Sequence, residues 1–322
     1  MRFTLLTSLS LAIGAVPAFA AEFTYENQTA WSDISPTCGI GARQSPIDIV
    51  TADAVYNEVA RDFVYTNPSL VFGMITNNGH TIQYTLNDAS AANTYAEGVL
   101  SDSDSTFSLK QLHFHWGITV SNGSEHLMDG KSYPLEVHLV HLNTKYASID
   151  EGAANADGLA VIGLFFEETA DESMGTSALA AIAEYAKTNN SVEFMDGATT
   201  EKIPLNLDIL VNQSQILTTK RFYTYEGSLT TPGCNEAVQW IIAEGVGKVS
   251  TSTMDAIRMA KHTTDPRRDT DGIAPNFRDT QALNGRVVTS SFDVDGNGST
   301  INSVGPATWL IAVIAALTAM VA

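Results

Sequence analysis

Two histidines separated by one residue are the first feature of this sequence that could do chemistry. If residues 111–116 form a β-strand, His113 and His115 share one face with Gln111, because side chains alternate between the two faces of a strand. Two imidazoles at this spacing can share a metal ion. By itself the spacing more often belongs to a surface or packing role, so a third ligand is needed to predict a metal centre.

A second segment, residues 134–141, supplies that ligand. If it is also a strand, Glu136 and His138 share one face while His141 points to the other. Three neutral histidines around one open position are the arrangement of a catalytic zinc ion. Gln111 and Glu136 could each accept the remaining ring N–H of a ligating histidine and fix its tautomer. The alternative for Glu136 is an exposed carboxylate at a strand rim, but its place beside a second histidine-bearing strand favours the functional interpretation.

The elements that must position these side chains are mainly strands. Short apolar or alternating runs rich in Val, Ile and aromatic residues predict strands over 47–50, 81–86, 109–116, 135–142, 159–166 and 237–243. Helical spacing behind a Ser/Thr cap predicts only two helices, over 176–189 and 252–261. No repeat or linker divides residues 21–291, so we expect one mainly β domain there.

Composition excludes several functions. The chain of 322 residues carries 17 Lys and Arg against 36 Asp and Glu, a net charge of −19, which disfavours a nucleic-acid partner because phosphate binding needs a basic surface. Its 44% apolar and 16% charged residues can build a large core, which excludes a disordered or fibrous chain.

Both ends of the sequence carry targeting signals. Residues 1–20 have an apolar run that ends in Ala18, Phe19 and Ala20, the pattern of a cleaved signal peptide. The apolar segment 307–322 is shorter than the roughly 20 residues of a spanning helix and follows a polar spacer, 292–306, with small residues around Asn297. This pattern indicates a glycosylphosphatidylinositol (GPI) anchor and attachment to the outer face of the plasma membrane. The alternatives are an unprocessed hydrophobic C-terminal peptide and a soluble extracellular protein.

Secretion changes how the two cysteines are interpreted. In an oxidising compartment Cys38 and Cys234, 196 residues apart, most simply form one disulfide; a free buried pair is the less common alternative. Glycosylation sequons, each weak alone, begin at Asn27, Asn122, Asn189, Asn212 and Asn297.

Nine short blocks occur in the order in which a known family has them. They cover residues 44–49, 77–80, 111–117, 124–126, 136–141, 158–163, 225–232, 276–278 and 281–286. On these blocks the sequence resembles the α-class carbonic anhydrases from about 44 to 288. The resemblance implies a central, mostly antiparallel twisted sheet of about ten strands with a conical cleft. It also implies reversible hydration of CO2 to bicarbonate and a proton by zinc-bound hydroxide, with ester hydrolysis as a side activity.

The resemblance assigns the reacting centre residue by residue. His113, His115 and His138 match the zinc ligands, and Gln111 and Glu136 match the residues that orient His113 and His138. Zinc among neutral imidazoles lowers the pKa of bound water to roughly 7, so hydroxide is available at neutral pH.

Further positions match the rest of the cleft. Thr230 matches the hydroxyl that donates to Glu125 and accepts from the hydroxide, although a turn hydroxyl is its plain alternative. His80 matches the proton shuttle at the rim, where an exposed turn histidine is the alternative. Tyr25 matches a residue of the solvent network. Five residues match the family's substrate pocket: Val140, Val161, Leu229, Thr231 and Trp240. Taken singly, each would more often be an ordinary residue of the hydrophobic core.

Departures from the family pattern leave this set intact. Phe23 stands two residues before Tyr25 where the family has Trp, and Leu142, Gly233 and Gln83 replace other usual residues. The resemblance therefore implies an active enzyme that takes CO2 and bicarbonate and is inhibited by sulfonamides and anions, with membrane contact only through the lipid anchor. Two alternative functions are disfavoured. A zinc hydrolase of esters or peptides would usually carry a His-Glu-x-x-His motif on a helix, which this sequence does not have. A non-catalytic adhesin on this fold would typically have lost a histidine ligand, and this sequence retains all three.

Overall fold

The computed structural model describes residues 23–58, 60, 63–67, 69–92, 94–98, 105–174, 179, 182–185, 203–260 and 273–294. The predicted signal peptide, the apolar C-terminal segment and the sequons at Asn189 and Asn297 lie outside these residues. Of the helix predicted over 176–189, only residues 179 and 182–185 are described, and these are helical. Within the described residues, no helix has the length and apolar character needed to cross a bilayer.

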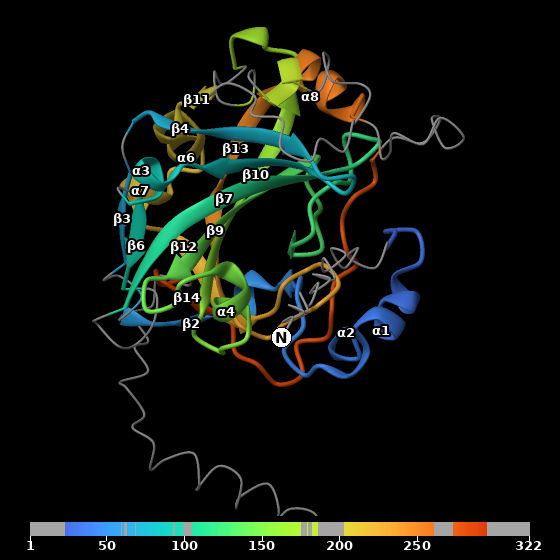
Figure 1. Ribbon diagram of the computed structural model, residues 1–322, viewed down its shortest axis with the longest axis vertical. Helices are drawn as coiled ribbons and strands as arrows, with labels where there is room; N and C mark the ends of the chain where they lie inside the picture. Colours follow the sequence, from blue (N-terminus) through green and yellow to red (C-terminus); the bar gives the residue numbers. More distant parts are fainter. Residues whose placement is uncertain are drawn as a thin grey trace, which may run out of the picture.

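A twisted sheet of 12 strands forms the body of the described residues (Figure 1). In pairing order its main path is β11 (Ile203–Leu205), β4 (Val71–Asn77), β5 (Ile82–Leu86), β7 (Thr106–Trp116), β9 (Leu135–Asn143), β10 (Leu159–Thr169), β13 (Val238–Ser250), β12 (Phe222–Gly227), β14 (Thr289–Ser290) and β2 (Val55–Tyr56). β3 (Val64–Thr66) pairs with β6 (Tyr95–Glu97), which also pairs with β7. β10 with β13 and β14 with β2 are parallel, and the other pairs of this sheet are antiparallel. The prediction of a mainly β, mostly antiparallel fold is confirmed.

A second, two-stranded sheet pairs β1 (Asp48–Ile49) with β8 (Leu127–Met128) in parallel. The predicted strand over 47–50 is therefore shorter than expected. Conversely, β7, β10 and β13 extend beyond their predicted ends; the added parts of β10 and β13 pair with each other, up to Thr169 opposite Ser250.

The expectation of only two helices is wrong. The predicted helix over 252–261 is present as α8 (Thr251–Arg258), which begins behind the Ser250 hydroxyl cap. α6 (Leu207–Gln213) was missed, because seven residues carry too short an apolar pattern to distinguish a helix from a loop. The other short helices are α1 (Trp31–Ile34), α2 (Thr37–Ile40), α3 (Asp88–Ala91), α4 (Ile149–Ala153) and α7 (Ile216–Thr219), with 3-10 turns at Gln28–Ala30, Thr51–Asp53 and Glu172–Met174.

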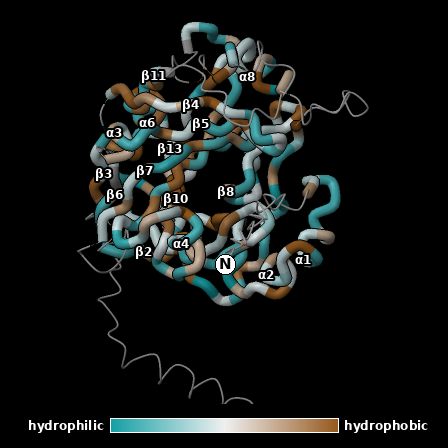
Figure 2. Tube along the Cα trace, in the orientation of Figure 1, coloured by the Kyte–Doolittle hydropathy of each residue, from teal (hydrophilic) through white to brown (hydrophobic). Residues whose placement is uncertain are grey.

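Two apolar clusters lie on opposite faces of the central strands. The larger contains Leu112 and Leu139, and the second contains Val140 and Trp240. Because Leu139 and Val140 are neighbours on β9, alternation sends one side chain to each cluster. Figure 2 shows the hydrophobic stretches gathered along these strands, with hydrophilic segments on the outer loops.

The predicted disulfide between Cys38 and Cys234 is present and confirmed. It joins α2 to the loop between β12 and β13, the loop that also carries Thr230. The Cys234 N–H donates to the Thr231 carbonyl at 2.9 Å, so the bridge lies directly against the cleft loop. The described sequon residues Asn27, Asn122 and Asn212 are all exposed.

Candidate metal centre

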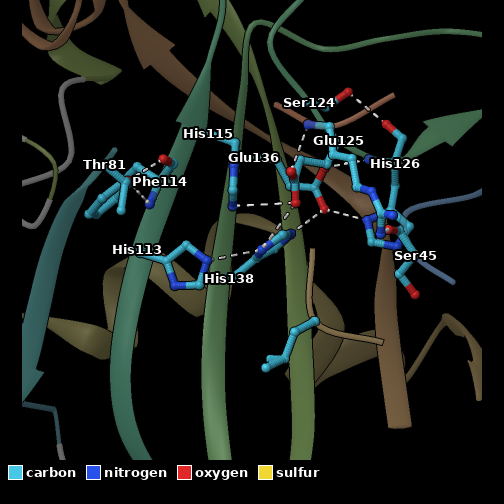
Figure 3. Close-up of polar contacts among 12 residues, drawn as sticks. Ser45, Thr81, His113, Phe114, His115, Ser124, Glu125, His126, Glu136 and His138 are labelled. Atoms are coloured by element: carbon cyan, nitrogen blue, oxygen red, sulfur yellow. Dashed lines mark hydrogen bonds and ion pairs between the residues drawn. The ribbon is translucent and has the colours of Figure 1, made fainter. Parts of the chain in front are cut away.

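The register between β7 and β9 brings the three predicted ligands together. His113 lies directly opposite His138, and His115 lies opposite Glu136. His113 Nε2 and His138 Nδ1 are 3.3 Å apart, and one nitrogen from each of the three rings lies within 4.8 Å of the others. In Figure 3 the three imidazoles point toward one another from the two neighbouring strands.

The second nitrogen of each ring faces an acceptor. His113 Nδ1 donates to Gln111 Oε1 at 2.9 Å, and His138 Nε2 donates to Glu136 Oε1 at 2.7 Å. His115 Nδ1 donates to the main-chain carbonyl of Asn276 at 2.8 Å. An acceptor on the outer nitrogen leaves the lone pair on the inner nitrogen, so three lone pairs converge on one point. This is the donor set that a zinc ion requires.

Burial keeps these imidazoles in the neutral, metal-binding form. It lowers the pKa of His115 to about 3, and it lowers the pKa values of His113 and His138 as well. Although burial alone raises the pKa of Glu136, the imidazoles of His126 and His138 hold it well below its usual range. The result is a charged carboxylate behind neutral ligands.

His126 is a neighbour of the site that was not predicted. Its Nδ1 donates to Glu136 Oε1 at 2.7 Å, and its main-chain N–H donates to Glu136 Oε2 at 2.8 Å (Figure 3). Its Nε2 lies 2.7 Å from the Tyr225 hydroxyl, which donates to Ser45 Oγ at 2.9 Å. The block 124–126 contained the signal, but only the fold shows that its histidine turns toward β9.

Glu125 lies behind the triad and contacts Thr230, which lines the cavity. Burial raises the pKa of Glu125 well above its usual range; the hydrogen bond from Thr230 and the Arg278 main-chain N–H, which donates at 2.9 Å, offset only part of this rise. Glu125 Oε2 also lies 3.4 Å from His115 Nε2. The Thr230 hydroxyl is thus held between a buried carboxylate and the cleft.

A cavity of about 250 Å³ opens in front of the three imidazoles. The predicted pocket residues Val140, Val161, Leu229, Thr231 and Trp240 all line it, as do Thr230, His113, His115, His138 and Gln111. Ile149, at the start of α4, also lines the cavity and was missed, because its segment carries no motif. Glu125 and Glu136 are absent from the lining and lie behind it. Tyr25, His80 and Gln83 line the cavity as well.

His80 is held at the rim by an aromatic contact. Its ring stacks on Phe23 with centroids 3.9 Å apart and planes 10° apart. Phe23 thus fixes one face of the His80 ring. Burial raises the pKa of the nearby Tyr25, so its hydroxyl stays protonated.

Three neutral imidazoles that face an open, partly apolar pocket are the arrangement typical of metal-dependent enzymes that act on a small substrate. The family model of eukaryotic-type carbonic anhydrases matches residues 26–292. Carbonic anhydrase 7 of Mus musculus is 39% identical over 265 residues, which cover 81% of this chain and 93% of the relative. Carbonic anhydrase 6 of Bos taurus is 33% identical over 283 residues (84% and 81%), and carbonic anhydrase 6 of Homo sapiens 34% identical over 301 residues (89% of each).

The chain belongs to the eukaryotic-type, α-class carbonic anhydrase family and is an enzyme with carbonate dehydratase activity.

Proposed function

We propose that His113, His115 and His138 hold one zinc ion and that CO2 is hydrated in the cavity in front of them. The observation that carries this proposal is the convergence of three inner ring nitrogens while each outer nitrogen faces an acceptor. When bound, zinc supplies a Lewis acid that makes a hydroxide nucleophile available near neutral pH. The chain's own residues bind the substrate, orient the attacking group and carry the proton away.

The apolar wall receives CO2. Val140, Val161, Leu229 and Trp240 line the cavity beside the three histidines. A nonpolar substrate loses little hydration when it enters such a pocket, whereas charged bicarbonate is disfavoured there and leaves.

Thr230 orients the attacking group. Its hydroxyl donates to Glu125 and therefore presents lone pairs, not a proton, toward the cavity. Those lone pairs can accept a hydrogen bond from the nucleophile and aim it at the carbon of CO2. Arg278 and Thr230 together fix the Glu125 carboxylate that this arrangement needs.

His80 takes the proton out. It lines the same cavity as the three imidazoles, and an imidazole can accept a proton near pH 7. Water in the cavity would carry the proton from the centre to this ring, and buffer would then remove it. Tyr25 and Gln83, which also line the cavity, would organise that water.

One assay separates this function from its alternatives. The purified protein should acidify a CO2 solution, and removal of the metal by a chelator, or an aromatic sulfonamide, should abolish the effect. Restoring zinc should restore the rate. Ester cleavage without CO2 hydration would identify a zinc hydrolase, and a zinc-free protein with neither activity would identify a binding protein on this fold.

We further propose that the enzyme acts outside the cell, attached by a GPI anchor. The short uncharged C-terminal segment after a polar spacer, the leader-like segment 1–20, the disulfide and the exposed sequon residues support this location. A phosphatidylinositol-specific phospholipase C should release the enzyme from intact cells. Mature protein that stays attached and retains residues 309–322 would overturn the anchor, and so would a fully soluble secreted form.

A further inference from the structure

The strand ladder between β5 and β7 ends just before the rim histidine. The paired residues run from Thr85 opposite Gln111 to Gln83 opposite His113. His80 and Thr81 lie beyond the last of these pairs, alongside Phe114. The connection between the rim and β7 must therefore come from side chains.

Two side chains make that connection. The Thr81 hydroxyl donates to the Phe114 carbonyl at 2.5 Å and accepts from the Phe114 N–H at 3.2 Å, and Figure 3 shows both contacts. Asn276 reaches further: its Nδ2 donates to the carbonyls of His80 and Phe114, both at 3.0 Å. One amide thus contacts the main chain on both sides of the gap.

The same residue also contacts the metal centre. Asn276 Oδ1 accepts from the Trp116 N–H at 2.7 Å, and the Asn276 main-chain carbonyl accepts from His115 Nδ1 at 2.8 Å. The residue is 0% exposed, so none of these contacts competes with solvent. Both amide N–H groups and the amide oxygen are used, which fixes the orientation of the side chain.

His80 is fixed through its main chain as well as its ring. Its N–H donates to Asn78 Oδ1 at 3.0 Å, its carbonyl accepts from Asn276, and its ring stacks on Phe23. Asn276 is the partner in this set that also contacts a predicted metal ligand.

We propose that the Asn276 side chain is a positioning residue that sets the place of His80 relative to His115, and hence the length of the proton path. This inference rests on the proposed function, in which His80 exports the proton. Transfer through a short water chain depends steeply on the separation and alignment of its ends, since displacements near 1 Å can change rates by up to about 100-fold. A loosened rim should slow proton export and leave the attack on CO2 intact.

The test compares Asn276→Ala, His80→Ala and the double variant, all loaded with zinc. In weak buffer Asn276→Ala should lower kcat by about fivefold or more and leave kcat/KM within about twofold, and imidazole should restore much of the loss. The double variant should match His80→Ala within about twofold, because residues that act through one another are not additive. Zinc should remain at one ion per chain.

A second readout does not depend on activity. Hydrogen exchange of a peptide that covers residues 77–86 should be faster in Asn276→Ala, while exchange in β9 stays unchanged. Asn143→Ala is the matched control: Asn143 is also a buried asparagine, 2% exposed, whose amide donates to the Asp157 carbonyl. It should lower stability without changing kcat or exchange over 77–86. If Asn276→Ala does not accumulate in folded form, Asn276→Asp replaces it, because the carboxylate keeps an acceptor for the Trp116 N–H. The same changes in kcat, kcat/KM, zinc content and hydrogen exchange are then expected of Asn276→Asp.

Three results would overturn the inference alone. They are an unchanged kcat in Asn276→Ala beside a slow His80→Ala, an additive loss in the double variant, and an equal fall of kcat and kcat/KM with loss of zinc. An unchanged kcat in His80→Ala would instead overturn the proton path, and the inference with it.

Discussion

The two faces of β9 have the same burial but different chemistry. All nine residues of the strand are buried. Glu136 and His138 face the cavity side, where the Glu136 carboxylate accepts from both His126 and His138, whereas Leu139 and its neighbours on the other face pack in the larger apolar cluster. Burial therefore does not distinguish the site from the core; the partners of the polar groups do.

Two histidines of this strand make the contrast sharper. His138 lies against His113, His115 and Glu136. His141, also fully buried, lies 3.3 Å from the Ala160 carbonyl and 3.4 Å from the hydroxyl of Tyr65, whose ring packs edge-on against it. The same residue type at the same depth is a candidate metal ligand on one face and a core residue on the other.

The largest expected effect is the loss of metal when the histidine on the cavity face of β9 is replaced, but not when the one on the core face is. His138→Ala leaves two imidazoles where three are needed, so bound zinc should be lost and CO2 hydration should fall by about 1000-fold or more. His141→Ala should keep one zinc per chain and instead lower the free energy of unfolding by about 2 kcal/mol. Metal analysis of both purified variants checks this, and undiminished zinc in His138→Ala would refute the ligand assignment.

Glu136→Gln should weaken metal retention without removing a ligand. The carboxylate accepts from both His138 and His126, so its neutral replacement should accelerate zinc dissociation by about 10-fold to 100-fold. Leu139→Ala, on the opposite face, should leave zinc dissociation unchanged and lower unfolding free energy by about 2–5 kcal/mol. Zinc transfer to a chromophoric chelator measures both, and equal dissociation rates in wild type and Glu136→Gln would contradict the prediction.

On the core face of β9, His141 should make the free energy of unfolding fall with decreasing pH. Burial lowers the pKa of His141 to about 4, from an unfolded value near 6.5. The unfolded state therefore binds the extra proton first, and the contribution of neutral His141 is lost as the pH falls from about 6.5 toward 4. Between pH 7.5 and 5 the loss should be about 2 kcal/mol. Urea unfolding of wild type and His141→Phe checks this: the variant should lack that part of the slope, and parallel pH profiles would refute it.

The smallest expected effect is on kcat, from replacement of His80 at the rim of the cavity. His80→Ala should lower kcat in weak buffer by about tenfold and leave kcat/KM for CO2 nearly unchanged, because attack on CO2 precedes proton export. Added imidazole should restore much of the loss. Stopped-flow assays over a range of buffer concentrations test this; an equal fall in both parameters, or no response to imidazole, would place His80 outside the proton path.

Much of the site was predictable because strand periodicity acts locally. Alternation alone placed His113 with His115 and Glu136 with His138, and it separated His141 from them, as the register shows. The disulfide was predictable because the chain has two cysteines and a leader-like segment over residues 1–20, which together favour one bridge. The short helix α6 was not, since seven residues carry little periodic signal.

Other parts of the site depend on contacts that no local pattern encodes. His126 lies outside the two histidine-bearing strands, and the pairing of its ring with Glu136 and Tyr225 follows from how the chain folds back over β9. Ile149 enters the cavity through the placement of α4. Neither residue belongs to a periodic pattern, so their contacts could not be inferred from spacing.

The sequence by itself determined which side chains could bind metal and which strand faces they share, because residue type and a period of two are properties of the chain alone. The tertiary structure decided which atoms complete the centre. The partner of His115 is a main-chain carbonyl, that of Asn276, 161 positions away. Every residue has a main-chain carbonyl, so only the folded structure determines that His115 contacts the one of Asn276. The Asn276 side chain, in turn, connects the rim at His80 to the same centre.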